Sequence, residues 1–368
     1  MKKRGKEGKG KEKKEKQKCS IGLAIDFPKA ERFSTGILSF DKALNGGLVW
    51  GSLVELFGEE SEGKTTIGLQ FLAQAQKEGA KVMLLDMEHA IDTSYVEKFL
   101  DLSKLYLEQP LSIEECFAKI HEFYNLFPDD YKIILVDSVA AFSTDAQISE
   151  DDFIAGHTTG HGSRQKGAVA SYMSSPEGVK SILRRPDWRK TITIFVNQTR
   201  DKVEFGGGFP GKKPAVSTKY TTGGNALKFY AGFRISIKSI GFITEGGGDD
   251  SKEEAANKIK IGKKVRMIIV KNKYGAPYVP VFLHLYYGTG FSALDDLISI
   301  GLEAGIITQT GAWFEYSGRK CQGRMDLLSC LKDDVVLLDN LSKECAAFLN
   351  DVELEQIPEE EKKDVDEE

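Results

Sequence analysis

Residues 58–65 constrain the fold of this chain more than any other segment. They read Gly-Glu-Glu-Ser-Glu-Gly-Lys-Thr, which matches the pattern G-x-x-x-x-G-K-[ST]. An apolar, strand-like run at 53–57 precedes the match, and a helix-like run with Ile67, Phe71 and Ala75 at helical spacing follows it. The glycines allow a tight turn whose N–H groups point at an anion, and the helix N-terminus adds partial positive charge. The segment predicts a strand–loop–helix unit that binds nucleotide phosphates.

The polar residues of this loop have distinct expected roles with ATP and Mg²⁺. Lys64 is expected to reach the β- and γ-phosphates of ATP, and Thr65 to place its hydroxyl on Mg²⁺. The other loop residues offer backbone N–H groups to the phosphates. The loop residues expected around the nucleotide are Gly58, Glu59, Glu60, Ser61, Glu62, Gly63, Lys64 and Thr65.

Three further apolar runs indicate buried parallel strands that end in polar residues: 82–85, 133–136 and 192–196. Asp137 follows the second run, and an acid at this place beside a phosphate loop would hold hydrated Mg²⁺. Glu88 follows the first run, where a carboxylate could orient and deprotonate water in line with the γ-phosphate. Asn197 and Gln198 follow the third run, as polar groups that could sense the γ-phosphate. Taken alone, each acid would also fit an ordinary solvated loop.

These motifs, in this order, resemble those of the RecA recombinase family. The matching stretches are 34–36, 38–41, 58–66, 86–92, 136–141, 195–198, 221–231, 270–273, 276–277, 285–288 and 311–314. The run at 221–231 is the most specific, because a phosphate loop alone is shared by many families. The resemblance covers most of residues 33–318. It implies an α/β fold: a RecA-type P-loop ATPase core, with a mostly parallel twisted sheet between two layers of helices, and a small α+β C-terminal domain.

The resemblance also implies how the rest of the nucleotide is held. Thr66 extends the matched phosphate loop by one residue. Tyr95 and Tyr287 match positions that flank the adenine, with Asp92 nearby.

Other matched residues are implied to act between molecules. Lys271 and Lys273 match a pair that contacts the γ-phosphate held by a neighbouring subunit, as arginine fingers do in trans. Phe229 matches an aromatic residue of the subunit interface. Lys238 and Arg266 match basic positions of a secondary site for the incoming duplex DNA. The implied assembly is a homo-oligomer in the form of an open helical filament.

Two Gly-rich polar stretches lie where the family has its DNA-binding loops: 149–166 and 201–222. We expect both to lack regular structure and to order on single-stranded DNA. Phe205 or Phe209 could wedge between bases, and Arg200 flanks the second loop on its N-terminal side. The residues that flank it on the other side are Thr222, Gly223, Gly224 and Asn225.

Charge is distributed unevenly along the chain. Residues 1–18 carry ten Lys and Arg against three Glu, and residues 351–368 carry ten Asp and Glu against two Lys. Because neither end can bury much apolar surface, we expect both to fray or to be disordered. The expected organisation is a basic N-terminal polymerisation segment, an ATPase core with two DNA-binding loops, a C-terminal domain and an acidic tail: 1–32, 33–290, 291–350 and 351–368.

The two charged ends have different expected roles. In the family the equivalent N-terminal helix and strand pack on the neighbouring subunit, and residues 19–27 read as such a strand. We favour this role over a DNA-binding arm or a solubilising tail. The acidic tail is expected to occupy a basic channel in competition with DNA, until salt or Mg²⁺ screens its charge.

Composition narrows the class of protein further. No run approaches the ~20 apolar residues of a membrane span, and no secretory apolar region is present, so we expect a cytoplasmic protein without a membrane partner. The five cysteines are scattered, odd in number and without zinc-site spacing, which indicates free thiols in a reducing compartment. His157 and His161 stand four apart but bring no further ligands, so we expect no metal site there.

The function implied is that of an ATP-dependent recombinase. It would form a filament on single-stranded DNA, exchange strands with double-stranded DNA and hydrolyse ATP in response to DNA. Two other functions stay open: a DNA-dependent ATPase such as a helicase or remodeler, and a structural coat for single-stranded DNA with weak hydrolysis. A repressor that undergoes self-cleavage is a further partner that the sequence leaves open.

Glu59, Glu60 and Glu62 distinguish this phosphate loop, because the family usually has proline and serine at the first and last of these positions. Negative charge near a polyphosphate repels it unless the side chains turn away. We therefore predict weakened ATP affinity or a stronger dependence on Mg²⁺.

Overall fold

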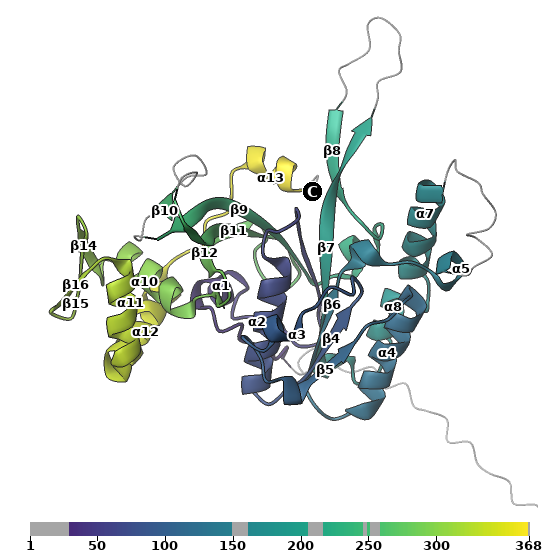
Figure 1. Ribbon diagram of the computed structural model, residues 1–368, viewed down its shortest axis with the longest axis horizontal. Helices are drawn as coiled ribbons and strands as arrows, with labels where there is room; N and C mark the ends of the chain where they lie inside the picture. Colours follow the sequence, from purple (N-terminus) through teal and green to yellow (C-terminus); the bar gives the residue numbers. More distant parts are fainter. Residues whose placement is uncertain (1–28, 149–160, 205–215, 246–248, 251–257, 367–368) are drawn as a thin grey trace, which may run out of the picture. The chain divides into compact units, whose positions relative to one another are not determined.

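The structure is a computed structural model, and it describes residues 29–148, 161–204, 216–245, 249–250 and 258–366 (Figure 1). The chain divides into two compact units, 1–31 and 32–368. Every element named below belongs to the second unit. The predicted strand at 19–27, with the rest of the basic segment up to residue 28, lies outside the described residues.

The core is a mixed sheet whose central strands are parallel. Its strands among the described residues are β3 (Leu53–Gly58), β4 (Lys81–Asp86), β5 (Leu105–Glu108), β6 (Lys132–Asp137), β7 (Thr191–Glu204), β8 (Val216–Thr221), β9 (Phe233–Thr244), β10 (Asp249–Asp250), β11 (Lys260–Asn272), β12 (Val279–Tyr286) and β13 (Gly290–Phe291). Their order is β13-β12-β11-β9-β3-β7-β6-β4-β5, with β10 beside β9 and β8 beside β7. The strands from β9 through β3 to β5 run parallel, and those from β9 to β13 are antiparallel.

Helices cover both faces of this sheet. They are α1 (Leu38–Ala43), α2 (Lys64–Lys77), α3 (Thr93–Val96), α4 (Ile113–Leu126), α5 (Asp145–Ile148), α7 (His161–Ser174), α8 (Val179–Leu183) and α9 (Ala226–Tyr230), with short 3₁₀ turns at Leu102–Lys104, Val139–Ala141 and Trp188–Lys190. One buried apolar cluster includes α1, α2 and α3, and another includes α4, α7, α8 and α9. The predicted α/β fold is therefore confirmed. Within the described ranges, no helix is both long enough and apolar enough to cross a membrane.

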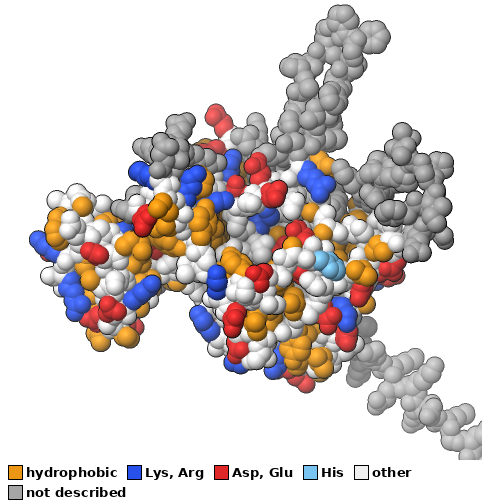
Figure 2. Space-filling view, viewed as in Figure 1, with side chains coloured by type: hydrophobic (Ala, Val, Ile, Leu, Met, Phe, Trp, Pro, Cys, Tyr) orange, Lys and Arg blue, Asp and Glu red, His pale blue; other side chains and the backbone are white. Residues whose placement is uncertain are grey.

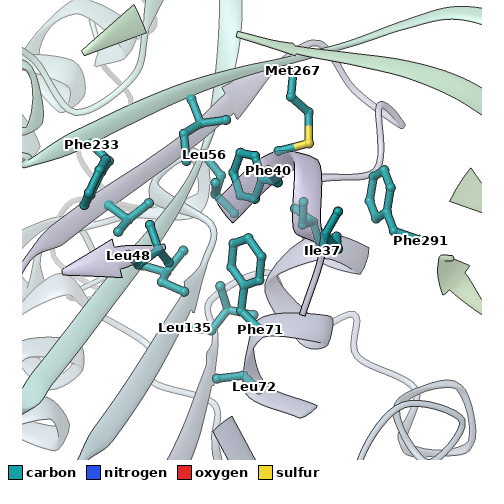
Figure 3. Packing of buried hydrophobic residues seen from close by; sticks show 14 of the residues in the cluster. Ile37, Phe40, Leu48, Leu56, Phe71, Leu72, Leu135, Phe233, Met267 and Phe291 are labelled. Atoms are coloured by element: carbon teal, nitrogen blue, oxygen red, sulfur yellow. The ribbon is translucent and has the colours of Figure 1, made fainter. Parts of the chain in front are cut away.

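Strand β6 shows why an unbroken apolar run marks a strand that is buried on both sides. Successive side chains of a strand point to opposite faces of the sheet. Ile133 and Leu135 lie in the cluster with Phe71 of α2, and Figure 3 shows Leu135 beside Phe71. Ile134 and Val136 lie in the cluster on the other face.

A smaller set of elements follows the core. Its elements are α10 (Ala293–Glu303), the antiparallel strands β14 (Thr308–Thr310), β15 (Trp313–Tyr316) and β16 (Arg319–Gln322), and the helices α11 (Arg324–Asp333) and α12 (Val335–Asp351). These elements have an apolar cluster of their own. The carboxylate of Asp296 joins α10 to α1, because it accepts hydrogen bonds from the N–H and the hydroxyl of Ser39. A separate domain from residue 291 stays a prediction, since residues 32–368 form one compact unit.

The prediction that the acidic tail is disordered is wrong for its described part. Helix α13 (Glu359–Asp366) forms there. Ile357 and Val365 are buried with Phe57 of β3 and side chains of β11, and the N–H of Ile357 donates to the carbonyl of Tyr278 at 2.9 Å. The prediction rested on the charges of the tail and overlooked Ile357 and Val365, the two apolar side chains that anchor the tail to the sheet.

Regular structure also extends into both segments that were predicted to be loops. Helix α7 begins at His161, so the end of the first segment is helical. Strand β7 continues to Glu204 and pairs with β8 in an antiparallel hairpin beyond the core sheet (Figure 1). The remainder of both segments, including His157, Phe205 and Phe209, lies outside the described residues.

A fully buried ion pair joins three central strands. Glu55 of β3 is 0% exposed, and the Nε of Arg234 on β9 donates to its Oε2 at 2.6 Å. The Nδ2 of Asn197 on β7 donates to the other carboxylate oxygen at 2.8 Å. The Arg234 guanidinium also lies 4.5 Å from the ring centre of Phe57. A buried charge is tolerated only when its partners satisfy it, so this carboxylate fixes the relative positions of β3, β7 and β9.

The variant Arg234→Met should lower the free energy of unfolding by about 3–5 kcal/mol, because it leaves the Glu55 carboxylate buried without its cation. Urea denaturation followed by circular dichroism measures the change. Lys238→Met is the control, since Lys238 is exposed on the same strand, and it should cost less than about 0.5 kcal/mol. Equal losses in both variants would contradict the role given to the ion pair.

The variant Asp296→Asn should weaken the pH dependence of stability. Burial raises the pKa of Asp296 to about 6, from an ordinary value of 3.8. The folded state therefore binds this proton more tightly than the unfolded state, and stability falls as pH rises between these two values. Removing the titrating group should flatten this fall by up to roughly 3 kcal/mol. Unfolding free energies measured across this pH window test the prediction, and an unchanged slope would contradict it.

Candidate functional site

The phosphate loop connects β3 to α2. Gly58 is the last residue of β3, and Lys64 is the first residue of α2. Gly63 precedes the helix with a φ of 96°, in the left-handed region that glycine adopts without strain. The helix N-terminus, with its unpaired N–H groups and positive dipole end, therefore opens towards the loop.

A cavity of about 330 Å³ lies at this loop. It is lined by Glu60, Ser61, Glu62, Gly63, Lys64, Thr65, Thr66, Glu88, Asp137, Val196, Gln198, Lys263, Leu285 and Tyr287. Residues from distant parts of the chain meet there because the parallel strands β3, β4, β6 and β7 end at one edge of the sheet. The structure thus brings the predicted loop together with Glu88, Asp137, Gln198 and Tyr287.

Thr65 and Asp137 form a pair that fits a divalent cation. The Thr65 hydroxyl donates to Asp137 Oδ2 at 2.6 Å. Burial raises the pKa of Asp137 to about 6, and the bond from Thr65 acts in the opposite direction. A buried carboxylate gains from a nearby cation, and Mg²⁺ commonly keeps several waters while taking one or two protein ligands. In the described part of the chain, no group of three or more His, Cys, Asp and Glu side chains could hold a metal.

Glu88 and Gln198 meet at the cavity. The Nε2 of Gln198 donates to Glu88 Oε1 at 3.4 Å, and the Ser138 hydroxyl donates to the same oxygen. Glu88 follows β4 and is exposed, so a water molecule can reach it. The residue predicted to activate water is therefore in contact with the residue predicted to sense the γ-phosphate.

Asn197 has a structural role that differs from its prediction. Its side chain is fully buried, donates to Glu55 and to the carbonyl of Thr222 at 2.9 Å, and accepts the N–H of Gln198 at 2.9 Å. The interpretation of Asn197 as a γ-phosphate sensor is wrong, because this side chain points into the sheet. It instead links Gln198 to Thr222, which flanks the second predicted DNA loop.

Two lysines lie at the phosphate loop. The Nζ of Lys64 donates to the carbonyl of Glu59. Burial lowers the pKa of Lys64, and the charge of Asp137 partly offsets this effect. The Nζ of Lys263, from β11, donates to the carbonyl of Ser61 at 2.6 Å. Lys263 was not predicted from the sequence, because it lies in a lysine-rich run that is typical of a solvated strand.

The glutamates of the loop differ in their surroundings. Glu59 and Glu60 are exposed. Glu62 is partly buried, and its carboxylate accepts the backbone N–H of Ser239 on β9. Its charge still acts on Lys64, whose pKa it raises against the effect of burial. The predicted weakening of ATP affinity by these glutamates stays a prediction.

Of the three residues predicted near the adenine, Tyr287 lines the cavity and Tyr95 contacts the lining residue Thr66. The hydroxyls of Tyr95 and Thr66 are 3.2 Å apart, and Tyr287 lines the cavity with 50% of its surface exposed. Asp92 caps α3 by accepting the N–H of Ser94 at 2.9 Å, and its hydrogen bonds with Ser94 lower the pKa of Asp92. The two tyrosines offer flat, partly apolar surfaces that suit a base.

Lys271 and Lys273 do not line the cavity of their own chain. Their amines donate to carbonyls at the end of α9: Lys271 to Lys228 at 2.6 Å and Phe229 at 3.1 Å, and Lys273 to Tyr230 at 3.4 Å. Burial, and then the charge of Lys273, lowers the pKa of Lys271. Phe229 beside them is exposed. The action of both lysines on the nucleotide of a neighbouring subunit stays a prediction.

A second cavity, of about 470 Å³, lies among the residues predicted to bind single-stranded DNA. It is lined by Val139, Ala140, Ala141, Phe142, Ser143, Gln147, Val169, Ala170, Arg200, Tyr220, Thr221, Thr222, Gly223 and Gly224. Arg200 lies on β7 opposite Tyr220 of β8. Gly224 has a φ of 74°, and a Cβ there would lie 2.7 Å from the Cβ of Ala170, so glycine is required. Asn225 is exposed at the start of α9.

Lys238 and Arg266, predicted to hold duplex DNA, lie opposite each other on β9 and β11. Lys238 is exposed, whereas Arg266 donates to Glu361 of α13 at 2.9 Å. Acidic and basic side chains are interspersed on the face shown in Figure 2. The acidic tail therefore occupies one of the two basic positions predicted for the duplex.

Comparisons with known proteins identify the family of this chain. Residues 13–292 match the model of the RecA N-terminal domain. The chain is 34% identical to Protein RecA of Chlorobium chlorochromatii over 325 residues, which is 88% of this chain and 82% of that protein. It is 35% identical to Protein RecA of Agrobacterium fabrum and 36% identical to that of Rhizobium rhizogenes, each over 317 residues, or 85% of this chain and 78% and 79% of those proteins. With a family model that spans most of its length, the chain belongs to the RecA family.

Proposed function

We propose that this protein is an ATP-dependent homologous recombinase. It forms a helical filament on single-stranded DNA in the cytoplasm, pairs that strand with a homologous duplex and hydrolyses ATP in response to DNA. The observation that carries the proposal is a hydrogen-bonded path between the two cavities. It runs from Glu88 through Gln198 and Asn197 to Thr222. A recombinase needs such a path, because nucleotide binding must change the grip on DNA.

The nucleotide cavity supports ATP with Mg²⁺ as the cofactor. This pair supplies an electrophilic γ-phosphate whose charge the metal reduces. Lys64 and the loop N–H groups would hold the phosphates, and Thr65 and Asp137 would hold the metal. Tyr95 and Tyr287 would flank the base. The fit rests on the buried Asp137 carboxylate beside the Thr65 hydroxyl.

Glu88 is the proposed general base for hydrolysis. Ser138 and Gln198 both donate to its Oε1, so Oε2 is the oxygen that takes the proton from water. Gln198 would exchange Glu88 for the γ-phosphate oxygen as its hydrogen-bond partner. That exchange would shift β7. Because Asn197 and Arg200 lie on β7, the shift would move both residues relative to the second cavity.

The side chains exposed at α9 and at the end of β11 support the proposal of a filament. Phe229 is an exposed aromatic side chain beside Lys271 and Lys273, and the lysines already form hydrogen bonds to that end of the helix. A neighbour that buries Phe229 would receive both lysines at its own nucleotide. Such a head-to-tail contact repeats without closing, which gives an open helix.

Strand exchange between circular single-stranded DNA and a homologous linear duplex tests the proposed function. We expect ATP-dependent joint molecules and their conversion to nicked circles. Pairing exchange is nearly balanced in energy, so base pairing supplies the specificity and ATP sets binding and release. Unwinding of a forked duplex without strand exchange would instead support a helicase or remodeler. Single-stranded DNA binding without DNA-stimulated hydrolysis would support a structural coat.

The variant Glu88→Gln should reduce DNA-dependent ATP hydrolysis by ~10²–10⁴-fold while ATP and DNA still bind, because it removes the base and keeps its shape. The filament should then persist on DNA, since release depends on turnover. Hydrolysis and electron microscopy measure the two effects. Glu60→Gln, another exposed carboxylate of the same cavity, is the control and should remain active. Loss of ATP binding in Glu88→Gln would assign Glu88 a structural role.

The variant Glu361→Gln should increase duplex DNA binding at low salt by roughly twofold to fivefold, the range expected for releasing one partly exposed ion pair. The substitution removes the ion pair of Arg266 and leaves the buried side chains of Ile357 and Val365 in place. Glu360→Gln is the matched control, because it removes the same charge from an exposed neighbouring position. Equal binding by the two variants in a salt titration would show that the tail acts only through its net charge.

A further inference from the structure

Lys263 is a cation of the nucleotide cavity that the proposed function leaves without a role. It lies on β11, opposite Leu285 of β12, and both residues line the cavity. Its Nζ donates to the carbonyl of Ser61 at 2.6 Å. Paired strands, rather than a loop, hold its backbone, so the position of the amine is defined by the sheet.

Carboxylates outnumber cations among the side chains that line the cavity, so the charge of this amine matters there. Four carboxylates line the cavity, those of Glu60, Glu62, Glu88 and Asp137, whereas Lys64 and Lys263 are its lining cations. A nucleotide triphosphate adds further negative charge. Charges a few ångströms apart in a partly enclosed site interact strongly, so a second cation lowers the repulsion that the loop glutamates impose.

The hydrogen bond of Lys263 to the phosphate loop resembles that of Lys64. Lys64, the lysine of the phosphate-loop motif, donates to the carbonyl of Glu59 in the structure. Lys263 makes the same kind of bond to the carbonyl of Ser61, two residues further along the loop. Both amines therefore lie one hydrogen bond from the loop backbone whose N–H groups bind phosphate. An amine in this place can transfer its hydrogen bond from a carbonyl to a phosphate oxygen.

We propose that Lys263 is a second phosphate-binding cation, which contacts the polyphosphate of the nucleotide from the β11 side and compensates for Glu60 and Glu62. The proposal rests on the proposed ATP site and adds a residue to it. Its contact is with the phosphates beyond the α-phosphate, the β-phosphate included, because the amine lies on the phosphate loop and not beside Tyr95. The contribution should therefore be large for nucleoside di- and triphosphates and small for the monophosphate.

Isothermal titration of the full chain with a non-hydrolysable ATP analogue, ADP and AMP, each with Mg²⁺, tests this proposal. Lys263→Met should raise the Kd for the analogue and for ADP roughly tenfold, and the Kd for AMP less than about twofold. Lys264→Met is the matched control, because it removes the same charge from the next residue of β11, which is outside the cavity lining. It should leave all three affinities unchanged.

Two conservative variants separate a phosphate contact from a structural one. Lys263→Arg keeps the charge and should retain most of the affinity, whereas Lys263→Gln keeps a donor without charge and should behave like Lys263→Met. Thermal unfolding of each variant identifies a loss of fold. An equal loss for AMP, ADP and the analogue would overturn the proposal, because it would mean that Lys263 only shapes the loop. So would equal binding by Lys263→Met and Lys264→Met.

Lys64→Ala distinguishes failure of this proposal from failure of the proposed function. If the wild type binds the analogue and Lys64→Ala does not, the nucleotide site stands and the Lys263 variants decide the proposal. If the wild type binds none of the three nucleotides, the proposed ATP site itself fails, and the role of Lys263 fails with it.

Discussion

The buried carboxylate of Glu55 is the constraint on which the rest of the structure depends. It lies on the central strand and accepts hydrogen bonds from Arg234 on one neighbouring strand and Asn197 on the other. A charge without access to water tolerates little displacement of its partners, so the three strands keep one register. Asn197 and Gln198 are consecutive on β7. The ion pair that holds the three strands together therefore also fixes the position of Gln198, the proposed γ-phosphate sensor.

Much of the nucleotide site could be predicted from the sequence, because each of its parts follows an apolar run. Strands that are buried on both faces are recognisable without a partner, and parallel strands present their final residues at one edge of the sheet. Glu88, Asp137 and Gln198 were located in this way, and the cavity contains all three. The resemblance to a family added Thr66 and Tyr287, which no local pattern marks.

The features that were missed depend on contacts between distant residues. Lys263 reaches the phosphate loop only through the pairing of β11 with β12, and nothing around it in the sequence marks that register. The tail is anchored by Ile357 and Val365, two apolar residues among many acids. The hairpin of β7 and β8 stands outside the apolar core, so its residues need no alternation of apolar and polar side chains and read as a loop.

Strand β7 has two sets of partners, since its first part pairs with β3 and β6 and its last part pairs with β8. Side chains along a strand alternate between its faces, so one residue inserted after Gln198 would turn Arg200 to the opposite side of the hairpin. Two residues would restore its direction and lengthen β7 by about 7 Å. The length of this strand can therefore change in evolution or design only in steps of two residues if Arg200 is to stay on the same side of the hairpin.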